Sequence, residues 1–395
     1  MLFIIGNKNI NVNIPKYAPF LHNKHNTINP NNIKNCLNVI VSLFSMFSFN
    51  TYAIKIPIKQ SVMLQICKLN INFAIMNTSF DSSNSPLVSF IITCRNLPVK
   101  QITECLDSIT GLSLRTQEKE IIVIDDGSDV SIIDRLEKYR DEIIYVRQKK
   151  NGVSSARNLG LRMASGNFIQ FINGEDKLIP DAYEHCLDIV RYNVPDIVLF
   201  NSYGKKKETS SFYIPEPMDG AHYMRHNNLH ATAWGYIFNR KILLDLRFNP
   251  SLLNTDEEFT PQLFLRAEKV YSTDIVAYSY KKRPSDSIKD KDPRLILKRL
   301  NDIEHIIFHL KELSEQLPIA DSQALQRRVS QLTIDYIFSI IRLTRSSKQL
   351  SSRLKRLEDC GLFPLPDKRY SHSYTILRKL TKNRMLRKCL SLVLK

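Results

Sequence analysis

From Pro86 onward the chain alternates short apolar runs with longer amphipathic stretches, and this rhythm constrains the fold more than any other sequence feature. Runs rich in β-branched and aromatic residues predict the strands Leu87–Thr93, Ile121–Ile124, Ile143–Val146, Phe168–Ile172 and Ile197–Phe200. The stretches between them predict the helices Val99–Ser108, Ser131–Arg140, Val153–Ala164 and Asp181–Arg191. Strands that alternate with helices of about 10–15 residues indicate βαβ units. The sequence therefore predicts an α/β fold with a doubly wound, mostly parallel sheet flanked by helices.

Polar side chains follow the first two predicted strands. Thr93 and Asn96 lie in the turn after the first strand, and Asp125 and Asp126 follow the second. Ligands of such sheets bind outside the carboxyl ends of the strands, where these residues are expected. Adjacent carboxylates there could bind sugar hydroxyls or a base N–H group. They could equally be solvated acids beside a helix cap.

The next two strand ends carry groups suited to a diphosphate and a cation. Asn151 and Arg157 open the predicted third helix, and backbone N–H groups with a guanidinium suit a diphosphate. An ordinary helix cap with a solvated arginine is the alternative. Asn173, Glu175 and Asp176 follow the fourth strand. Their oxygens could bind a hard divalent cation, or they could form only a polar turn.

Two later segments carry charge. Asp256, Glu257 and Glu258 precede a predicted helix at Phe259–Ala267, where acids favour the helix dipole and one could act as a general base. A predicted strand at Tyr278–Lys282 is followed by a basic loop that contains Arg283 and could close over phosphates. A solvated surface loop is the alternative interpretation.

The order and spacing of these segments resemble the family 2 glycosyltransferases. The resemblance covers residues 86 to about 290 and is carried by the strings PLVSFIITCRNLP, IIVIDDGSD, NGVSSARNLGLRMASGNFIQFINGED, TDEEF and YKKRPSDSI. It implies a GT-A-like fold for a catalytic domain at 86–290. It also implies inverting transfer of a sugar from a nucleotide diphospho-sugar, a UDP-sugar, to a hydroxyl of a glycan or lipid-linked acceptor. Such enzymes commonly build bacterial capsular or surface polysaccharide.

The same resemblance assigns roles to individual residues. Asp256 falls on the position of the catalytic base. The residues placed on the donor side are Thr93, Asn96, Asp125, Asp126, Asn151, Arg157, Asn173 and Arg283. Glu175 and Asp176 would hold Mn²⁺ or Mg²⁺, while Trp234 and Glu257 fall on the acceptor side.

The sequence departs from the family pattern at the metal motif and beside the base. Asn173-Gly174-Glu175 stands in place of Asp-x-Asp, and Thr255 replaces the usual Glu before the base. Arg95 stands where an aromatic residue is common. These departures leave an alternative open, namely a catalytically degenerate protein that binds a nucleotide-sugar or glycan. A nucleotidyltransferase would need a glycine-rich phosphate loop after the first strand, and TCRNLP lacks the glycines.

Residues 1–80 differ in composition from the rest of the chain. They contain seven Lys but no Asp, Glu or Arg, together with 15 Asn and 13 Ile. This bias predicts a poorly structured or non-native extension, with Met76 as the working start. The alternative is targeting, because Leu37–Phe49 is an apolar run with the length of a signal h-region, shorter than the roughly 20 residues of a membrane span.

Residues 291–395 are predicted to be helical, with one helix across Leu325–Leu343. From Pro366 to Lys395 there are nine Lys or Arg residues and one acid, interleaved with apolar positions. This pattern is typical of a basic amphipathic helix that lies on an anionic membrane surface, although a solvated helix packed on the catalytic domain has it too. The net charge of +17 is compatible with anionic partners, but the tail lacks the aromatic stacking motif of nucleic-acid binders. Seven scattered cysteines without metal spacing fit reduced thiols in a cytoplasmic protein. The basic tail could make that protein peripheral on the inner face of the cell membrane.

Overall fold

The structure is a computed structural model that describes residues 85–202, 213–281, 292–368, 370 and 372–382, together with two short N-terminal strands. The chain divides into two units, Met1–Phe80 and Asp81–Lys395. Within the first unit the described residues are β1 (Phe3–Ile4) and β2 (Asn9–Ile10), which pair antiparallel. The apolar run at Leu37–Phe49 and the predicted start at Met76 lie outside the described residues, as do Arg283 and the end of the basic tail.

The second unit is built on a mixed sheet in the order β5-β4-β3-β6-β9-β8-β10-β7. The strands are β3 (Val88–Cys94), β4 (Lys119–Asp125), β5 (Ile143–Arg147), β6 (Phe168–Asn173), β7 (Lys177–Leu178), β8 (Ile197–Ser202), β9 (Tyr236–Asn239) and β10 (Val270–Ser279). Strands β5, β4, β3 and β6 are parallel to one another, and so are β8 and β10. Strand β9 runs antiparallel between β6 and β8, and β7 runs antiparallel to β10.

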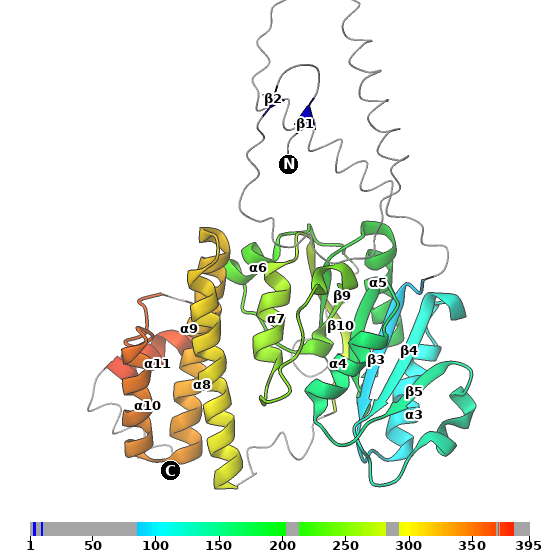
Figure 1. The fold of residues 1–395 in the computed structure, drawn as a ribbon, viewed down its shortest axis with the longest axis horizontal. Helices are drawn as coiled ribbons and strands as arrows, with labels where there is room; N and C mark the ends of the chain where they lie inside the picture. The colour runs from blue at the N-terminus through cyan, green and yellow to red at the C-terminus, as the bar shows by residue number, and fades with distance from the viewer. Residues whose placement is uncertain are drawn as a thin grey trace, which may run out of the picture. The chain divides into compact units, whose positions relative to one another are not determined.

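Helices cover both faces of this sheet (Figure 1). They are α3 (Val99–Thr110), α4 (Val153–Met163), α5 (Pro180–Asn193), α6 (Gly220–His226) and α7 (Asp256–Leu265), with the 3₁₀ segments η2 (Thr116–Glu118), η3 (Ile133–Tyr139), η4 (Ala233–Gly235) and η5 (Arg240–Leu243). Side chains alternate along each strand, so Phe90 and Ile92 join the apolar cluster under α3 and α5, while Ile91 joins the cluster under α4 and α7. Burial of both faces explains why the strands are nearly continuous apolar runs.

The α/β fold class is confirmed, and the differences from expectation are local. The five strands predicted between Leu87 and Phe200 are present. Ser131–Arg140 forms the 3₁₀ segment η3 rather than an α-helix, with a kink at Leu136. Of the strand predicted at Tyr278–Lys282, only Tyr278 and Ser279 are in a strand, as the end of the longer β10, and Lys282 lies outside the described residues. The sheet is less parallel than predicted because β9 was not foreseen. The four residues of β9 are too few to show a period of their own.

The C-terminal helices are α8 (Pro293–Glu315), α9 (Ile319–Thr344), α10 (Ser347–Asp359) and α11 (His372–Lys382). They lie beside the sheet, with α6 and α7 between them and the strands (Figure 1). One apolar cluster runs without interruption from Phe238 on β9 through Phe259 on α7 to Ile307 and Ile337 on α8 and α9. The C-terminal helices therefore share a core with the sheet, and the predicted domain boundary near residue 290 stays a prediction.

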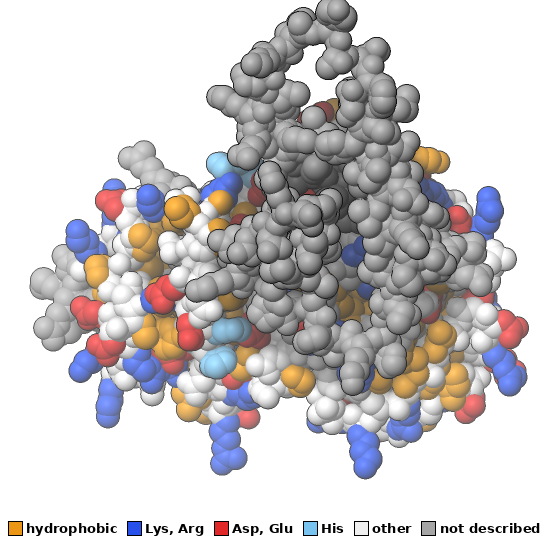
Figure 2. Space-filling model, turned by 45° about the horizontal axis from the view of Figure 1, so that its top comes forward, with side chains coloured by type: hydrophobic (Ala, Val, Ile, Leu, Met, Phe, Trp, Pro, Cys, Tyr) orange, Lys and Arg blue, Asp and Glu red, His pale blue; other side chains and the backbone are white. Residues whose placement is uncertain are grey.

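The described surface is mixed in charge. Lys and Arg side chains are spread over the visible face among acidic ones rather than gathered in one patch (Figure 2). None of the helices within the described ranges has the combined length and apolarity that a bilayer span requires. Only the first part of the basic tail is described, as α11, where Ile376 is 44% exposed.

Candidate active site

The carboxyl ends of four neighbouring strands bring most of the predicted residues together. Cys94, Asp125 and Arg147 are in register across β3, β4 and β5, and Thr93 is in register with Asn173 on β6. The parallel direction of these strands places every following loop at one edge of the sheet. The sequence prediction that these loops meet there is confirmed by the registers.

Asp125 is a buried organiser of the turn after β4. Its Oδ1 accepts hydrogen bonds from the Ser128 backbone N–H and hydroxyl, at 2.8 and 2.7 Å, and its Oδ2 accepts one from the Tyr145 hydroxyl at 2.7 Å. The Arg147 guanidinium lies 3.7 Å from the same Oδ2. Burial raises the pKa of Tyr145 to about 12, so this hydroxyl remains a donor at neutral pH. Asp125 is therefore not a solvated acid, because its carboxylate is buried and both oxygens are bonded within the protein. The donor contact predicted for Asp125 stays a prediction.

Asp126 ties the β4 turn to the start of α4. Its Oδ1 accepts from the Gln148 side chain at 2.7 Å and from the Asn151 backbone N–H at 2.8 Å, and its Oδ2 accepts from Gly152 at 3.0 Å. Gly152 precedes α4 with a φ of 89°, a conformation that other residues rarely adopt. Asp126 therefore fixes the position of Asn151, which is itself exposed.

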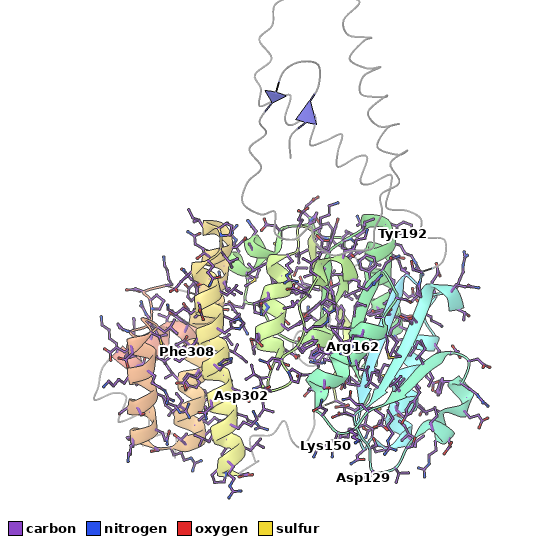
Figure 3. All side chains as sticks on the ribbon, in the orientation of Figure 1. Asp129, Lys150, Arg162, Tyr192, Asp302 and Phe308 are labelled. Atoms are coloured by element: carbon purple, nitrogen blue, oxygen red, sulfur yellow. The ribbon has the colours of Figure 1, made fainter. Side chains whose placement is uncertain are left out.

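Asn96 joins the loops that follow β3 and β4. Its backbone N–H donates to the Ser128 hydroxyl at 2.9 Å, and its side chain exchanges two hydrogen bonds with Asp129, at 2.8 and 3.0 Å. Asp129 and Lys150 lie near each other at this end of the molecule (Figure 3). An exposed asparagine that holds two strand-end loops together could contact a donor, as predicted, while it also shapes the edge.

The segment after β6 is arranged around a buried carboxylate. Asp176 accepts from the Lys281 backbone N–H through Oδ1 at 2.8 Å, and through Oδ2 from the Asn173 amide at 2.7 Å and the Tyr278 hydroxyl at 2.8 Å. Burial raises the pKa of Tyr278 well above its usual range, which keeps this hydroxyl a donor. Asp176 is 1% exposed. It therefore anchors the end of β10 to the end of β6, and this geometry gives no support to its predicted role as a metal ligand.

The remaining groups offer a limited cation site. Within the described ranges no three His, Cys, Asp or Glu side chains converge in a way that could hold a metal ion. Glu175 is half-buried, and it follows Asn173 and Gly174 in the chain. Mg²⁺ is often held by one or two carboxylates together with substrate phosphates. The Glu175 carboxylate with the side-chain oxygen of Asn173 fits that pattern.

Asp256, the predicted base, begins α7 and is held by two distant segments. Its Oδ1 accepts from Arg157 Nη1 at 2.5 Å, and its Oδ2 accepts from the Ala233 backbone N–H at 3.0 Å. The carboxylate remains 21% exposed, whereas the Arg157 side chain is buried. A carboxylate fixed at both oxygens and still open to solvent has the geometry that a positioned general base requires.

Arg157 lies against Asp256 rather than standing alone in a donor pocket. Its guanidinium is within 5.7 Å of the Phe171 ring centre and 5.2 Å of that of Phe248, both buried rings. This packing on aromatic rings, together with the ion pair, directs its charge toward the carboxylate. The donor contact predicted for Arg157 stays a prediction, and its described partner is Asp256.

Trp234 lies in η4, directly after the residue whose backbone holds Asp256. Its indole stacks on Tyr278, with ring centres 4.5 Å apart, and on Tyr280, at 5.7 Å. Its carbonyl accepts a hydrogen bond from Gln170 of β6 at 3.0 Å, and its neighbour Ala233 donates to Asp256. The acceptor contact predicted for Trp234 stays a prediction.

Comparison with known proteins identifies the segment that carries these strand ends. Residues 89–249 match the family described as glycosyl transferase family 2. Residues 89–249 are a family 2 glycosyltransferase domain. The predicted resemblance is thus confirmed, and the matched segment of the family 2 domain ends before Asp256 and the C-terminal helices.

Two curated relatives and one solved structure are similar to this chain. The glycosyltransferase GlyA of Streptococcus pneumoniae is 29% identical over 203 residues, which are 46% of this chain and 29% of GlyA. The uncharacterized glycosyltransferase EpsJ of Bacillus subtilis is 28% identical over 218 residues, which are 51% of this chain and 62% of EpsJ. The chain thus spans less than two thirds of either relative. S. aureus TarS 1–349 in complex with UDP-GlcNAc has a TM-score of 0.46 at 18% identity, covering 75% of this chain and 91% of that one.

Several residues of the site were not found from the sequence. Tyr278 and Tyr280 support Trp234, the Ala233 backbone holds Asp256, and Arg328 on α9 pairs with Glu257. Each of these contacts joins segments far apart in the chain. Only the aromatic pair at residues 278 and 280 had a local signal, since the strand predicted at Tyr278–Lys282 would place residues two apart on one face.

Proposed function

We propose that this protein transfers a sugar, with inversion, from a nucleotide diphospho-sugar to a hydroxyl of a glycan or lipid-linked acceptor in surface polysaccharide synthesis. The donor is proposed to be a UDP-sugar, and membrane contact is proposed through the basic tail. The observation that carries the proposal is the Asp256 carboxylate, held by Arg157 and Ala233 at the edge of a family 2 domain. The named relatives above are glycosyltransferases, which supports the same reaction class.

The reaction assigns separate tasks to the two sides of the site. The donor lies over the ends of β3, β4 and β6, where Thr93, Asn96, Asp126, Asn151 and Asn173 are proposed to contact it. Asp256 takes the proton of the acceptor hydroxyl, and the freed oxygen forms a bond to the anomeric carbon. The bond from that carbon to the diphosphate oxygen breaks in line, and the nucleoside diphosphate leaves with its electron pair.

A divalent cation, Mn²⁺ or Mg²⁺, is proposed to bind with the donor. Glu175 and the side-chain oxygen of Asn173 would hold it, because the oxygens of Asp176 are engaged by Tyr278, Asn173 and Lys281. When bound, such a cation neutralises charge on the leaving diphosphate. Arg283, outside the described residues, remains a proposed diphosphate contact, and Glu257 and Trp234 remain proposed acceptor-side residues.

A donor screen tests the proposal. The full chain is supplied with UDP-, GDP- and dTDP-sugars, with lipid-linked acceptors, and with or without Mn²⁺ or Mg²⁺, and release of nucleoside diphosphate is measured. We expect release from one donor, lost in Asp256→Asn and retained in Asp245→Asn, an exposed acid that pairs with Arg266 beyond the C-terminal end of α7. Nucleotide binding without release from any donor would instead identify a degenerate nucleotide-sugar binding protein.

A further inference from the structure

The C-terminal helices reach both segments that hold the base. Arg328 on α9 is buried, and its Nη1 donates to the Leu229 carbonyl at 2.8 Å. Its Nη2 forms an ion pair with Glu257, the residue that follows Asp256 at the start of α7. One guanidinium therefore connects α9 to the segment before η4 and to the first turn of α7.

The Leu229 segment matters because it leads directly to a hydrogen-bond donor of the base. Leu229 is 3% exposed, and a tight turn follows in which Thr232 N–H donates to His230 O and Gly235 N–H donates to Thr232 O. Within this turn lies Ala233, whose backbone N–H donates to Asp256. Fixing the Leu229 carbonyl therefore fixes the start of the short segment that aims Ala233 at the carboxylate.

Other contacts join the C-terminal helices to the same two segments, the one before η4 and the first turn of α7. Gln331 of α9 donates to the Asn228 side chain at 2.7 Å, and Arg327 donates to the Arg225 carbonyl. His309 of α8 lies 2.6 Å from Glu258. The run Asp256-Glu257-Glu258 is thus held by three different parts of the chain, namely α4, α9 and α8 in turn.

We propose that Arg328 is a positioning residue for the base, through which helix α9 sets the geometry of Asp256 and makes the C-terminal helices part of the active site. The inference rests on the proposed function for its assignment of Asp256 as base. A planar guanidinium can serve the Glu257 carboxylate and the Leu229 carbonyl at once, in two fixed directions. An ammonium at the same place is a point charge that cannot reproduce both directions, so lysine is a partial substitute.

The variants Arg328→Met and Arg328→Lys test this inference in the full chain. The matched control is Arg353→Lys, another buried arginine of the C-terminal helices, which bonds Asn301 and Tyr336. Steady-state kinetics give kcat and the donor KM separately. Hydrogen–deuterium exchange is followed in peptides that cover residues 229–235 and 255–259, because these readouts separate positioning from loss of fold.

We expect Arg328→Met to lower kcat by about 10- to 100-fold with the donor KM changed less than about threefold, because misplacement of a catalytic group costs up to about 10²-fold. Exchange in both peptides should rise about tenfold, and Arg328→Lys should recover part of both losses. Arg353→Lys should leave kcat of the folded protein and exchange in these peptides unchanged.

Two results would overturn the inference. One is unchanged exchange in the two peptides of Arg328→Met. The other is a loss of kcat in Arg328→Met that is matched by Arg353→Lys or explained by the unfolded fraction. If the wild type releases nucleotide from no donor, the proposed function fails, and the exchange measurement alone decides whether Arg328 orders the segments around Asp256.

Discussion

The two sides of the candidate site are held together by different parts of the chain. On the part of the donor side made of the loops after β3, β4 and β5, Asp125 and Asp126 bond residues from their own or the next βα unit, such as Tyr145 and Asn151. On the base side, made of Asp256 and its partners, the contacts span much longer distances in sequence. Arg157 precedes Asp256 by 99 residues, and Arg328 follows Glu257 by 71.

This difference indicates how each side depends on the rest of the molecule. The donor side needs only consecutive βα units and turn chemistry to assemble. The base side needs α4, the turn at η4 and two C-terminal helices in place together. Substitutions on the donor side should therefore change donor binding, and substitutions on the base side should change turnover.

The largest effect is expected at the base itself. Asp256→Asn keeps the shape and can still accept from Ala233, but it loses the group that takes the acceptor proton. We expect kcat to fall by about 10³-fold with the dissociation constant for the nucleotide unchanged, because general bases contribute in this range. Kinetics and calorimetric titration measure the two quantities, with Asp245→Asn as the control. If Asp256→Asn retained turnover, another residue would be the base, and the comparison between the donor side and the base side would fail.

The donor side is probed by Asp126→Ala. This change leaves the backbone N–H groups of Asn151 and Gly152 without their acceptor, which costs about 1 kcal/mol in free energy of unfolding, because both residues are exposed and water can replace the carboxylate. We expect the dissociation constant for the nucleotide to rise about tenfold, with kcat at saturating donor nearly unchanged. Chemical denaturation and titration are the measurements.

Asp129→Ala, at an exposed acid in the same loop, is the control for that change. Its bonds with Asn96 are exposed, so a smaller shift in the dissociation constant is expected. A fall in kcat as large as the change in binding would show that the two sides are not separable.

The donor side could be predicted from sequence, and the base side mostly could not. Strand periodicity located the ends where Thr93, Asn96, Asp125, Asp126 and Asn173 lie, because the carboxyl ends of parallel strands meet at one edge. The run Asp256-Glu257-Glu258 suggested a general base, and the family resemblance singled out Asp256 for that predicted role. Its partners on η4 and α9 depend on tertiary packing, which carries no periodic signal in either segment. Strand β9 was missed because its four residues show no period of their own, and without it the predicted sheet was more parallel than the observed one.

The departure at the metal motif gives a third prediction. In Asn173→Asp the new carboxylate faces Asp176 Oδ2 in place of the amide that now donates to it at 2.7 Å. We expect a loss of about 2 kcal/mol in free energy of unfolding at pH 7.5, because a hydrogen bond becomes a contact between like charges. The loss should shrink toward pH 5, since one of two adjacent carboxylates holds its proton to a higher pH than usual.

Denaturation with and without Mn²⁺ separates two explanations for Asn173. Recovery of the lost stability by Mn²⁺ in Asn173→Asp would show that an acid here completes a cation site that asparagine leaves weak. Asn167→Asp adds the same charge just before the opposite end of β6 and serves as the control. Equal destabilisation by both variants would mean that charge on this strand, rather than contact with Asp176, is the cause.

The smallest effect is expected where the base side meets α9. Burial raises the pKa of the Glu257 carboxyl, against the opposing charge of Arg328. The folded protein therefore retains this proton at pH values where the unfolded chain has lost it. Glu257 accordingly contributes stability below its ordinary pKa of about 4.5, and this contribution is lost as pH rises above that value.

Glu257→Gln lacks this titration, so the free energy of unfolding of the wild type relative to this variant should fall between about pH 4.5 and neutrality. The change should stay below about 1 kcal/mol, because the carboxylate is partly exposed and paired. Denaturation curves at several pH values measure the difference. A rise of wild-type stability relative to Glu257→Gln over this range would mean that the ion pair with Arg328 outweighs burial. The base side would then be held by charge more than by packing.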